Sequence, residues 1–215
     1  MKVAALTSDI NMGTSVGMDT SEDIDKRNDI GTDIAVGVSE ADLVRLATEL
    51  GREVCGVGAL IATAESCTGG LLARVLTETA GSSEWFERGF VTYSNDAKVD
   101  LLGVRLSTLQ AQGAVSEAVA REMAAGALKH SPAGLSLAVT GIAGPGGAVD
   151  GKPVGTVCFG WGLSLPDGGR EPLVISGQQR FDGDRAAVRR QAAAHALLHA
   201  TRLLRQRLQD QPPIG

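Results

Sequence analysis

The segment AESCTGG, residues 64–70, places two side chains that can attack a carbonyl next to each other. Ser66 carries a hydroxyl, Cys67 carries a thiol, and Gly69 and Gly70 follow. This pattern is typical of a tight strand-to-helix turn, where glycines let a ligand approach and the helix start offers free N–H groups. Such a turn can stabilise an oxyanion or bind a phosphate, but it also occurs as a plain β–α connection. The residues leave open which side chain is the nucleophile and which group takes its proton.

The three histidines are poorly placed to serve as that base. His130 is expected at the end of a helix, and His195 and His199 lie four residues apart on a C-terminal helix. The pair has the spacing of two metal ligands, but no further ligand follows at a suitable distance in the sequence. We therefore interpret His195 and His199 as packing or surface residues and expect no metal.

The segment TYSNDAK, residues 92–98, offers another base. Tyr93 is the only tyrosine of the chain, and Lys98 lies about one turn into the next expected helix. A buried lysine can lose its proton near neutral pH, and a tyrosine can relay a proton to it. The residues alone fit equally an exposed lysine and a tyrosine at a sheet edge, because most lysines are exposed.

A third segment, TGIAGPGG at residues 140–147, contains several glycines that expose backbone donors, and Pro145 makes it stiff. Taken alone it fits a surface loop as well as a ligand-binding loop. All three segments follow apolar runs that are expected to be strands. Because ligands of open α/β sheets bind at the carboxyl ends of strands, we expect the three segments to meet at one edge of a sheet.

The hydrophobic pattern predicts the elements that position these segments. A first helix is expected from Ser39, where SEAD reads as a capping box, and a last helix from Asp184 to Leu208. The helices expected between them start at Leu71, at Asn95 and after possible caps at Ser107 and Ser116. The expected strands cover residues 57–64, 90–93, 135–139, 156–161 and 173–175.

Strands that alternate with helices predict an α/β fold with helices on both faces of a central sheet. The last two strands are separated by the short turn PDGGREP, so we expect them to be antiparallel and the sheet to be mixed. The predicted fold is a three-layer α/β/α sandwich that forms one domain over residues 39–210.

Acidic residues are concentrated at the N-terminus. Residues 1–37 carry seven acidic and three basic side chains, which accounts for most of the net charge of −5. We interpret residues 1–38 as a disordered acidic extension. The nearly neutral remainder and an aromatic content of 3% argue against nucleic-acid binding. Three cysteines without a disulfide spacing, and the lack of a signal peptide or a long apolar run, predict a cytoplasmic protein outside the membrane.

The order of the motifs resembles that of a known family. The segments AESCTGG, AGSSEWFERGFVTYSNDAK, GAVS, TGIAGPGG and KPVGTV follow one another as in the CinA C-terminal family, over about residues 39–210. Within it the chain looks like the stand-alone nicotinamide-nucleotide amidohydrolases. The resemblance implies hydrolysis of the carboxamide of nicotinamide mononucleotide to nicotinic acid mononucleotide and ammonia, in pyridine nucleotide recycling. It implies no cofactor or metal, and it suggests a homodimer.

The resemblance also assigns roles to residues. The family's nucleophile, tyrosine and lysine correspond to Ser66, Tyr93 and Lys98, which makes Cys67 a packed neighbour. In the implied mechanism neutral Lys98, assisted by Tyr93, takes the Ser66 proton as the hydroxyl attacks the amide. Backbone N–H groups between Cys67 and Gly70 stabilise the oxyanion, and water then hydrolyses the acyl-enzyme.

The residues expected to bind the substrate surround these three: Glu65, Cys67, Thr68, Gly69, Gly70, Thr140, Gly141, Ala143, Gly144, Pro145 and Arg185. For the phosphate, the candidates are the helix start at 68–70, the 140–145 loop and Arg185, which lies four residues before Arg189. Two alternatives stay open. The chain could be a nucleotide-binding sensor without turnover, or a competence-related partner protein that keeps only the fold.

Overall fold

The computed structural model describes residues 37–165 and 172–210. The predicted acidic extension, except for residues 37 and 38, and nearly all of the PDGGREP turn lie outside the described residues.

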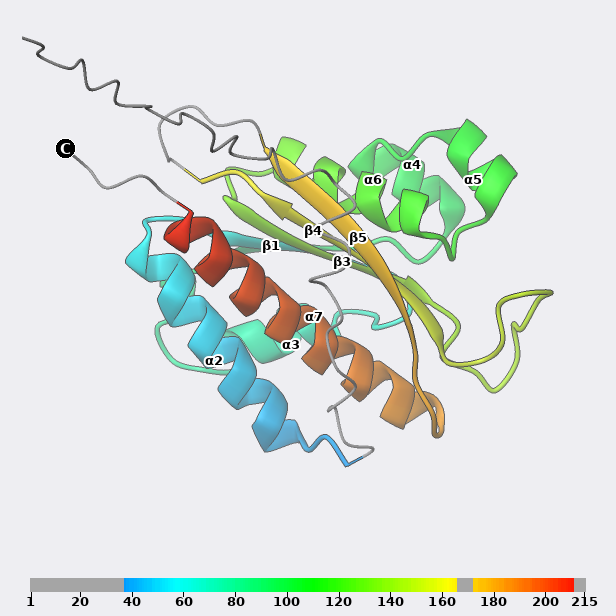
Figure 1. The fold of residues 1–215 in the computed structure, drawn as a ribbon, viewed down its shortest axis with the longest axis horizontal. Coiled ribbons are helices and arrows are strands. Elements are labelled where there is room, and N and C mark those ends of the chain that lie inside the picture. Colours follow the sequence, from blue (N-terminus) through cyan, green and yellow to red (C-terminus); the bar gives the residue numbers. More distant parts are fainter. Residues whose placement is uncertain (1–36, 166–171, 211–215) are drawn as a thin grey trace, which may run out of the picture. The chain divides into compact units, whose positions relative to one another are not determined.

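A five-stranded mixed sheet forms the centre of the described part (Figure 1). Its strands are β1 (Ile61–Glu65), β2 (Phe86–Val91), β3 (Leu135–Gly141), β4 (Thr156–Leu163) and β5 (Leu173–Arg180). They lie in the order β2-β1-β3-β4-β5. The strands β2, β1 and β3 are parallel, whereas β4 is antiparallel to β3 and β5 is antiparallel to β4. The predicted mixed sheet and its antiparallel pair are confirmed.

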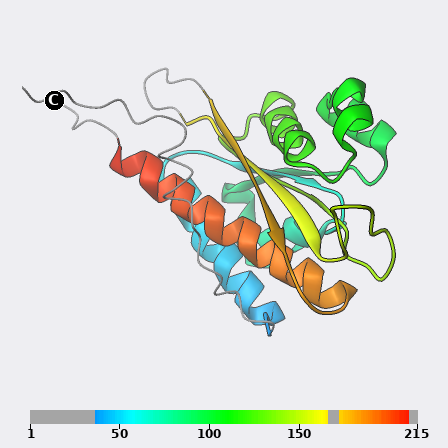
Figure 2. The same ribbon diagram turned by 45° about the vertical axis from the view of Figure 1, so that its right-hand side comes forward.

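Helices cover both faces of this sheet, as the turned view shows (Figure 2). One layer contains α2 (Glu40–Gly56), α3 (Leu71–Thr77) and α7 (Arg185–Gln209), and the other contains α4 (Asn95–Leu102), α5 (Leu106–Gln112) and α6 (Glu117–Lys129). A short 3-10 turn spans Ser82–Glu84. Each helical layer packs a separate apolar cluster against the sheet. The structure therefore has the three-layer α/β/α architecture that the sequence predicts.

Side-chain caps set the start of four helices. Ser39 and Asp42 form the predicted capping box of α2, and the side chains of Ser94, Ser116 and Asp184 each accept a hydrogen bond from an N–H of the helix that follows. A cap of this kind stabilises a helix by about 1 kcal/mol. The predicted cap at Ser107 is wrong, because the N-cap of α5 is Arg105, two residues earlier. The side chain of Glu122 accepts hydrogen bonds from the backbone N–H and guanidinium of Arg105 and so fixes that start.

Two strand boundaries also differ from the prediction. The strand expected from residue 57 begins at Ile61, because α2 extends to Gly56 and the N–H groups of Val57 and Gly58 bond back to helix carbonyls. The strand expected from residue 90 begins at Phe86. This strand lies at the edge of the sheet and is only half-buried, so its sequence FERGFV lacks the continuous apolar run of a central strand.

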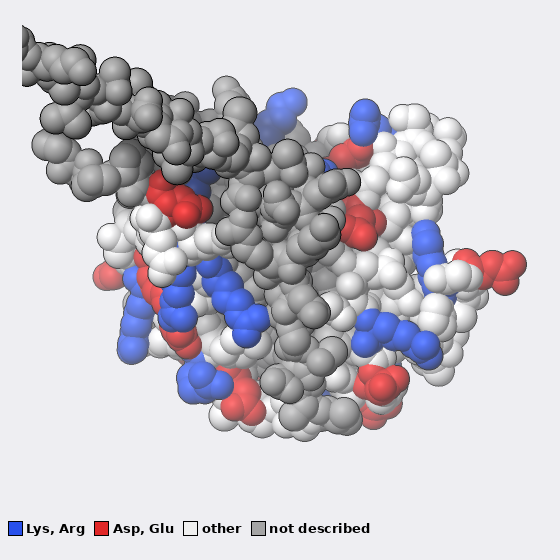
Figure 3. All heavy atoms as spheres, viewed as in Figure 1, with Lys and Arg blue, Asp and Glu red and all other residues white. Residues whose placement is uncertain are grey.

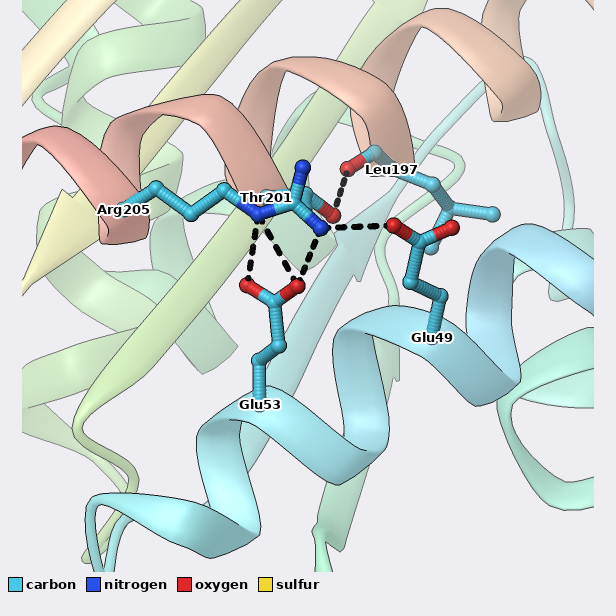
Figure 4. Close-up of polar contacts among 5 residues, drawn as sticks. All are labelled: Glu49, Glu53, Leu197, Thr201 and Arg205. Atoms are coloured by element: carbon cyan, nitrogen blue, oxygen red, sulfur yellow. Dashed lines mark hydrogen bonds and ion pairs between the residues drawn. The ribbon is translucent and has the colours of Figure 1, made fainter.

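The two longest helices, α2 and α7, are also joined by ion pairs on their outer side (Figure 4). Arg205 of α7 donates to Glu53 from Nε at 3.0 Å and to Glu49 from Nη2 at 2.7 Å. In Figure 3, basic and acidic side chains are interspersed over this part of the surface rather than gathered into a patch of one sign. Within residues 37–165 and 172–210, no helix combines the length and the apolar character needed to cross a bilayer.

Candidate active site

The carboxyl ends of β1, β2 and β3 lie side by side because these strands are parallel and in register. Glu65, the last residue of β1, is paired with Val91 of β2 and Val139 of β3. Beyond the strands, the Ser66 N–H donates to the Val139 carbonyl at 2.9 Å, and the Thr92 N–H donates to the Glu65 carbonyl at 2.8 Å. The segments AESCTGG, TYSNDAK and TGIAGPGG therefore start at the same edge of the sheet, as the sequence predicts.

At this edge the Nζ of Lys98 lies 3.2 Å from the Oγ of Ser66. Helix α4 begins at its cap Ser94, and Lys98 follows one turn later with a side chain that is only 1% exposed. Its Nζ is also 2.8 Å from the Thr92 carbonyl oxygen and 3.4 Å from the Ser94 carbonyl oxygen. The lysine amine is thus enclosed by the nucleophile turn and by the backbone that leads from β2 into α4.

Burial lowers the pKa of Lys98, because removal from water disfavours the ammonium form, while the neighbouring Cys67 acts in the opposite direction. A neutral amine has two N–H groups and one lone pair. The carbonyls of Thr92 and Ser94 can accept the two N–H groups, which leaves the lone pair for the hydroxyl proton of Ser66. This arrangement suits a base that activates Ser66.

The thiol of Cys67 is placed differently from the Ser66 hydroxyl. Cys67 is 6% exposed, and burial raises the pKa of its thiol to about 12. The thiol therefore stays protonated at neutral pH, and only the thiolate is a strong nucleophile. The geometry favours Ser66 as the attacking group.

The carboxylate of Glu65 anchors the turn that carries Ser66. Its oxygens accept hydrogen bonds from the N–H groups of Gly70, Leu72 and Ala73 at 2.9–3.0 Å. Glu65 was predicted to bind substrate, but its side chain is fully buried and holds the N-terminus of α3 instead. The chain can turn so tightly because Gly69 and Gly70 have φ angles of +57° and +90°, which side chains disfavour.

The backbone donors near Ser66 are fewer than predicted. The Gly70 N–H is taken by Glu65, and the Gly69 N–H donates to the Ser66 carbonyl at 3.1 Å. The Leu71 N–H in turn donates to the Thr68 carbonyl, so the helix start has little left for a phosphate. Apart from the Cys67 sulfur, which interacts with its own N–H, none of the described residues accepts a hydrogen bond from the N–H of Cys67 or Thr68. These two N–H groups remain as candidate oxyanion donors.

Tyr93 forms no hydrogen bond with the Ser66–Lys98 pair among the described residues. Its side chain is 63% exposed, and its hydroxyl oxygen accepts a hydrogen bond from Arg185 Nη2 at 3.1 Å. The predicted proton relay through Tyr93 is therefore not supported by this geometry.

Arg185, at the start of α7, joins two of the three loops. Besides its bond to Tyr93, it donates from Nη1 to the Gly144 carbonyl at 3.0 Å. Among the described residues, none accepts from the N–H groups of Ala143 and Gly144. The exposed Pro145 follows Gly144 after a cis peptide bond. The exposed guanidinium of Arg185 therefore lies beside a loop with two N–H groups that have no acceptor among the described residues, those of the buried Ala143 and the half-buried Gly144.

Two other predicted ligands in this loop have structural roles. Thr140 is 1% exposed and donates from its hydroxyl to the Ala114 carbonyl at 2.9 Å. A Cβ at Gly141 would lie within 3 Å of Thr156 and Val157 in β4. Both residues therefore support the base of the loop rather than line an open surface.

Arg189 is a site residue that the sequence indicated only by its spacing from Arg185. It is half-buried, and its Nη2 donates to the Thr68 carbonyl at 2.6 Å, so that it ties α7 to the nucleophile turn.

His195 and His199 follow on α7 and are buried in the core, as the packing interpretation predicts. Their rings contact those of Phe159 and Trp161, with the His199 and Trp161 rings stacked at 3.9 Å between centroids. Within the described residues, no group of three or more His, Cys, Asp or Glu side chains could hold a metal ion.

A family model for the CinA C-terminal domain matches residues 43–204. The chain belongs to the CinA C-terminal domain family. The nicotinamide-nucleotide amidohydrolase PncC of Escherichia coli K12 is 50% identical over 160 residues, which cover 74% of this chain and 93% of PncC. PncC of Enterobacter agglomerans is 50% identical over 165 residues, covering 77% and 97% of the two chains.

Solved structures of CinA proteins have the same fold. The crystal structure of competence/damage inducible protein CihA from Agrobacterium tumefaciens matches with a TM-score of 0.71 at 43% identity, over 79% of this chain and 98% of CihA.

Proposed function

We propose that this chain hydrolyses the carboxamide of nicotinamide mononucleotide and releases nicotinic acid mononucleotide and ammonia. Its 50% identity to PncC over nearly the whole of that protein supports the substrate and the reaction. The observation that carries the mechanism is the 3.2 Å distance between Lys98 Nζ and Ser66 Oγ in a buried setting. A buried lysine that has no carboxylate partner and lies beside a serine suits a base.

In the first half-reaction, the Ser66 hydroxyl attacks the carboxamide carbon while neutral Lys98 takes the hydroxyl proton. The N–H groups of Cys67 and Thr68 stabilise the oxyanion, and each such donor contributes about 3 kcal/mol to lowering a barrier of this kind. Lys98 then passes its proton to the amide nitrogen, and ammonia leaves. The positive pyridine ring withdraws electrons from the carbonyl and favours the attack.

In the second half-reaction, a water molecule hydrolyses the acyl-enzyme. Lys98, again neutral, takes a proton from the water as its oxygen attacks the ester carbon. The proton returns to Ser66 Oγ as the ester bond breaks, and nicotinic acid mononucleotide leaves and loses its remaining acid proton to the solvent, which gives the carboxylate. The free enzyme is restored without a cofactor.

The 5′-phosphate needs a binding site of its own. Arg185 uses two of its five N–H donors for Tyr93 and Gly144, so three remain for a phosphate. The N–H groups of Ala143 and Gly144 lie in the loop that Arg185 contacts. We place the phosphate between Arg185 and this loop, since a guanidinium binds phosphate through paired hydrogen bonds.

The proposal is tested by incubating the purified chain with nicotinamide mononucleotide and measuring ammonia. We expect release from the wild-type chain and a loss of at least about 10³-fold in Ser66→Ala, because that variant lacks the nucleophile. Cys67→Ala is the matched control, and it should keep its rate within a few fold.

Each contrary result has a clear meaning. Binding of nicotinamide mononucleotide without ammonia release from the wild-type chain would favour a nucleotide sensor. Full loss of activity in Cys67→Ala, with Ser66→Ala active, would reverse the choice of nucleophile. A chain that neither binds nor hydrolyses the nucleotide would favour a partner protein of the same fold.

A further inference from the structure

One aromatic side chain of this protein is exposed. All seven Phe, Trp and Tyr residues lie in the described part of the chain, and six of them are buried or half-buried. Tyr93, by contrast, is 63% exposed. Since the other aromatic side chains contribute to packing, the position of Tyr93 calls for a separate reason.

Tyr93 lies beside the reacting groups in the chain although its side chain forms no hydrogen bond with them in the described residues. The carbonyls of its two neighbours, Thr92 and Ser94, both lie within hydrogen-bonding distance of Lys98 Nζ. Val91 precedes Tyr93 by two residues and is 49% exposed. A Cβ built on Gly70 would lie 3.7 Å from Cγ2 of Val91. Val91 and Tyr93 therefore border the nucleophile turn with exposed apolar surface.

The ring of Tyr93 is also held in place. Its hydroxyl accepts from Arg185 Nη2, and Arg185 is itself fixed by its bond to the Gly144 carbonyl. A ring that is already immobilised loses little conformational freedom when a flat ligand stacks on it. The tyrosine is therefore anchored by its hydroxyl and offers its ring to a ligand.

We propose that the Tyr93 ring binds the positively charged pyridine ring of the substrate and gives the site its preference for the nucleotide with the cationic ring. This inference rests on the proposed function. The face of an aromatic ring attracts a cation through its quadrupole, and a neutral ring of the same shape lacks that attraction. Tyr93 is on this view a specificity-determining residue, and its hydroxyl positions the ring instead of moving a proton.

The test compares two ligands that differ in ring charge. The Ser66→Ala protein, which cannot hydrolyse the substrate, is titrated calorimetrically with nicotinamide mononucleotide and with its dihydro form, whose ring is uncharged. We expect tighter binding of the charged form. Adding Tyr93→Leu should weaken binding of the charged form about tenfold and leave the dihydro form nearly unchanged. Adding Tyr93→Phe, which keeps the ring, should preserve most of the preference.

Steady-state kinetics separates ring binding from a proton relay. In the otherwise wild-type chain, Tyr93→Phe should keep kcat within about threefold, and Tyr93→Leu should mainly raise KM. Leu106→Ala, another exposed apolar residue at the start of α5, is the matched control and should change neither constant.

Two results would overturn the inference. One is a large loss of kcat in Tyr93→Phe at unchanged KM, which would assign the hydroxyl to proton transfer. The other is a charge preference that survives Tyr93→Leu. Failure of the proposed function is a separate result, because it would appear as a wild-type chain that releases no ammonia.

Discussion

Lys98 occupies a buried position in α4 where an apolar side chain would stabilise the fold more. Lys98 is 1% exposed and its amine lies within hydrogen-bonding distance of two carbonyls and a hydroxyl, but no carboxylate contributes to its pKa. In a buried lysine without an anionic partner the balance shifts toward the neutral amine, because removal from water disfavours the ammonium form. The protein thus gives up stability at this residue, and the gain is a base next to Ser66.

The substitution Lys98→Met separates this cost from the function. Methionine fills a similar volume without a charge, so we expect an unfolding free energy equal to or above that of the wild-type chain. Ammonia release should fall by about 10²–10⁴-fold, the usual effect of removing a general base. Urea unfolding and an ammonia assay on the same preparation measure the two effects. A variant that is less stable and fully active would contradict the assignment.

The lowered pKa of Lys98 also sets the pH dependence. The base is active only when neutral, so kcat/KM should rise with pH and level off below 10.5, the ordinary lysine pKa. The folded protein binds the Lys98 proton more weakly than the unfolded chain does. The contribution of Lys98 to the unfolding free energy is therefore complete above pH 10.5 and decreases as the pH falls from 10.5 toward the lowered pKa of the folded state. A rate profile without an alkaline plateau below 10.5 would argue against a buried base.

At the scale of elements, the nucleophile turn depends on how α3 is attached to β1. Glu65 supplies one carboxylate for three N–H groups at the start of α3, which has no side-chain cap of its own. Because these donors are removed from water, leaving each one unpaired costs about 1–3 kcal/mol. The same bonds set the position of Ser66 relative to the helix.

Glu65→Ala should therefore destabilise the fold by at least about 3 kcal/mol and reduce ammonia release. Glu65→Gln should lower the unfolding free energy less than Glu65→Ala does, since its amide oxygen can still accept hydrogen bonds. Glu78→Gln is the control, because Glu78 is exposed and its pair with Arg74 at 3.6 Å contributes little. Denaturant midpoints of the three variants give the comparison. Equal midpoints for Glu65→Ala and the wild-type chain would refute the anchoring role.

The elements that sequence reasoning predicts well are those with local causes. The start of α2 follows from its capping box at Ser39, and the end of α4 follows from Gly103, whose φ is +68°. The start of β2 could not be predicted, because an edge strand has no continuous apolar run. The boundary between α2 and β1 was equally hidden, since an apolar run fits a helix end and a strand alike.

In the site, too, some features follow from the sequence and others do not. The meeting of Ser66 and Lys98 follows from parallel strands that end at one edge, which the motif order implies. The role of Glu65 and the direction of the Tyr93 side chain depend on rotamers and on distant partners such as Arg185. The partners of Glu65 are only five to eight residues away, but no sequence pattern reveals that its carboxylate turns back to the start of α3. Tyr93 and Arg185 are 92 positions apart, so their contact leaves no local pattern.

For the molecule as a whole, the core between α7 and the sheet contains a feature that links stability to pH. His195 and His199 are 6% and 7% exposed, and burial lowers the pKa of each to about 4, with Arg202 acting in the same direction. Trp161 lies against both rings, with centroids at 6.0 Å and 3.9 Å. The Nδ1 of His199 is buried without a partner among the described residues. Both imidazoles are therefore neutral in the folded protein at pH 7.

Acid should consequently unfold this protein from its core. The unfolded chain protonates its histidines near 6.5, whereas the folded protein does so only near 4. Between these values the unfolded state binds more protons, so stability is complete above 6.5 and is lost as the pH falls toward 4. For the pair the loss amounts to several kcal/mol, in proportion to the two pKa shifts.

The double variant His195→Leu/His199→Leu tests this link directly. Leucine has a similar volume and no titrating group, so stability at pH 7.5 should change little, since apolar replacement of an unpaired polar group is nearly neutral. The unfolding free energies measured in urea at pH 7.5 and pH 5 should then differ less in the double variant than in the wild-type chain. His130→Gln, at the exposed end of α6, is the control and should keep the wild-type difference. If the double variant loses as much stability on acidification as the wild-type chain, the acid sensitivity arises outside this core.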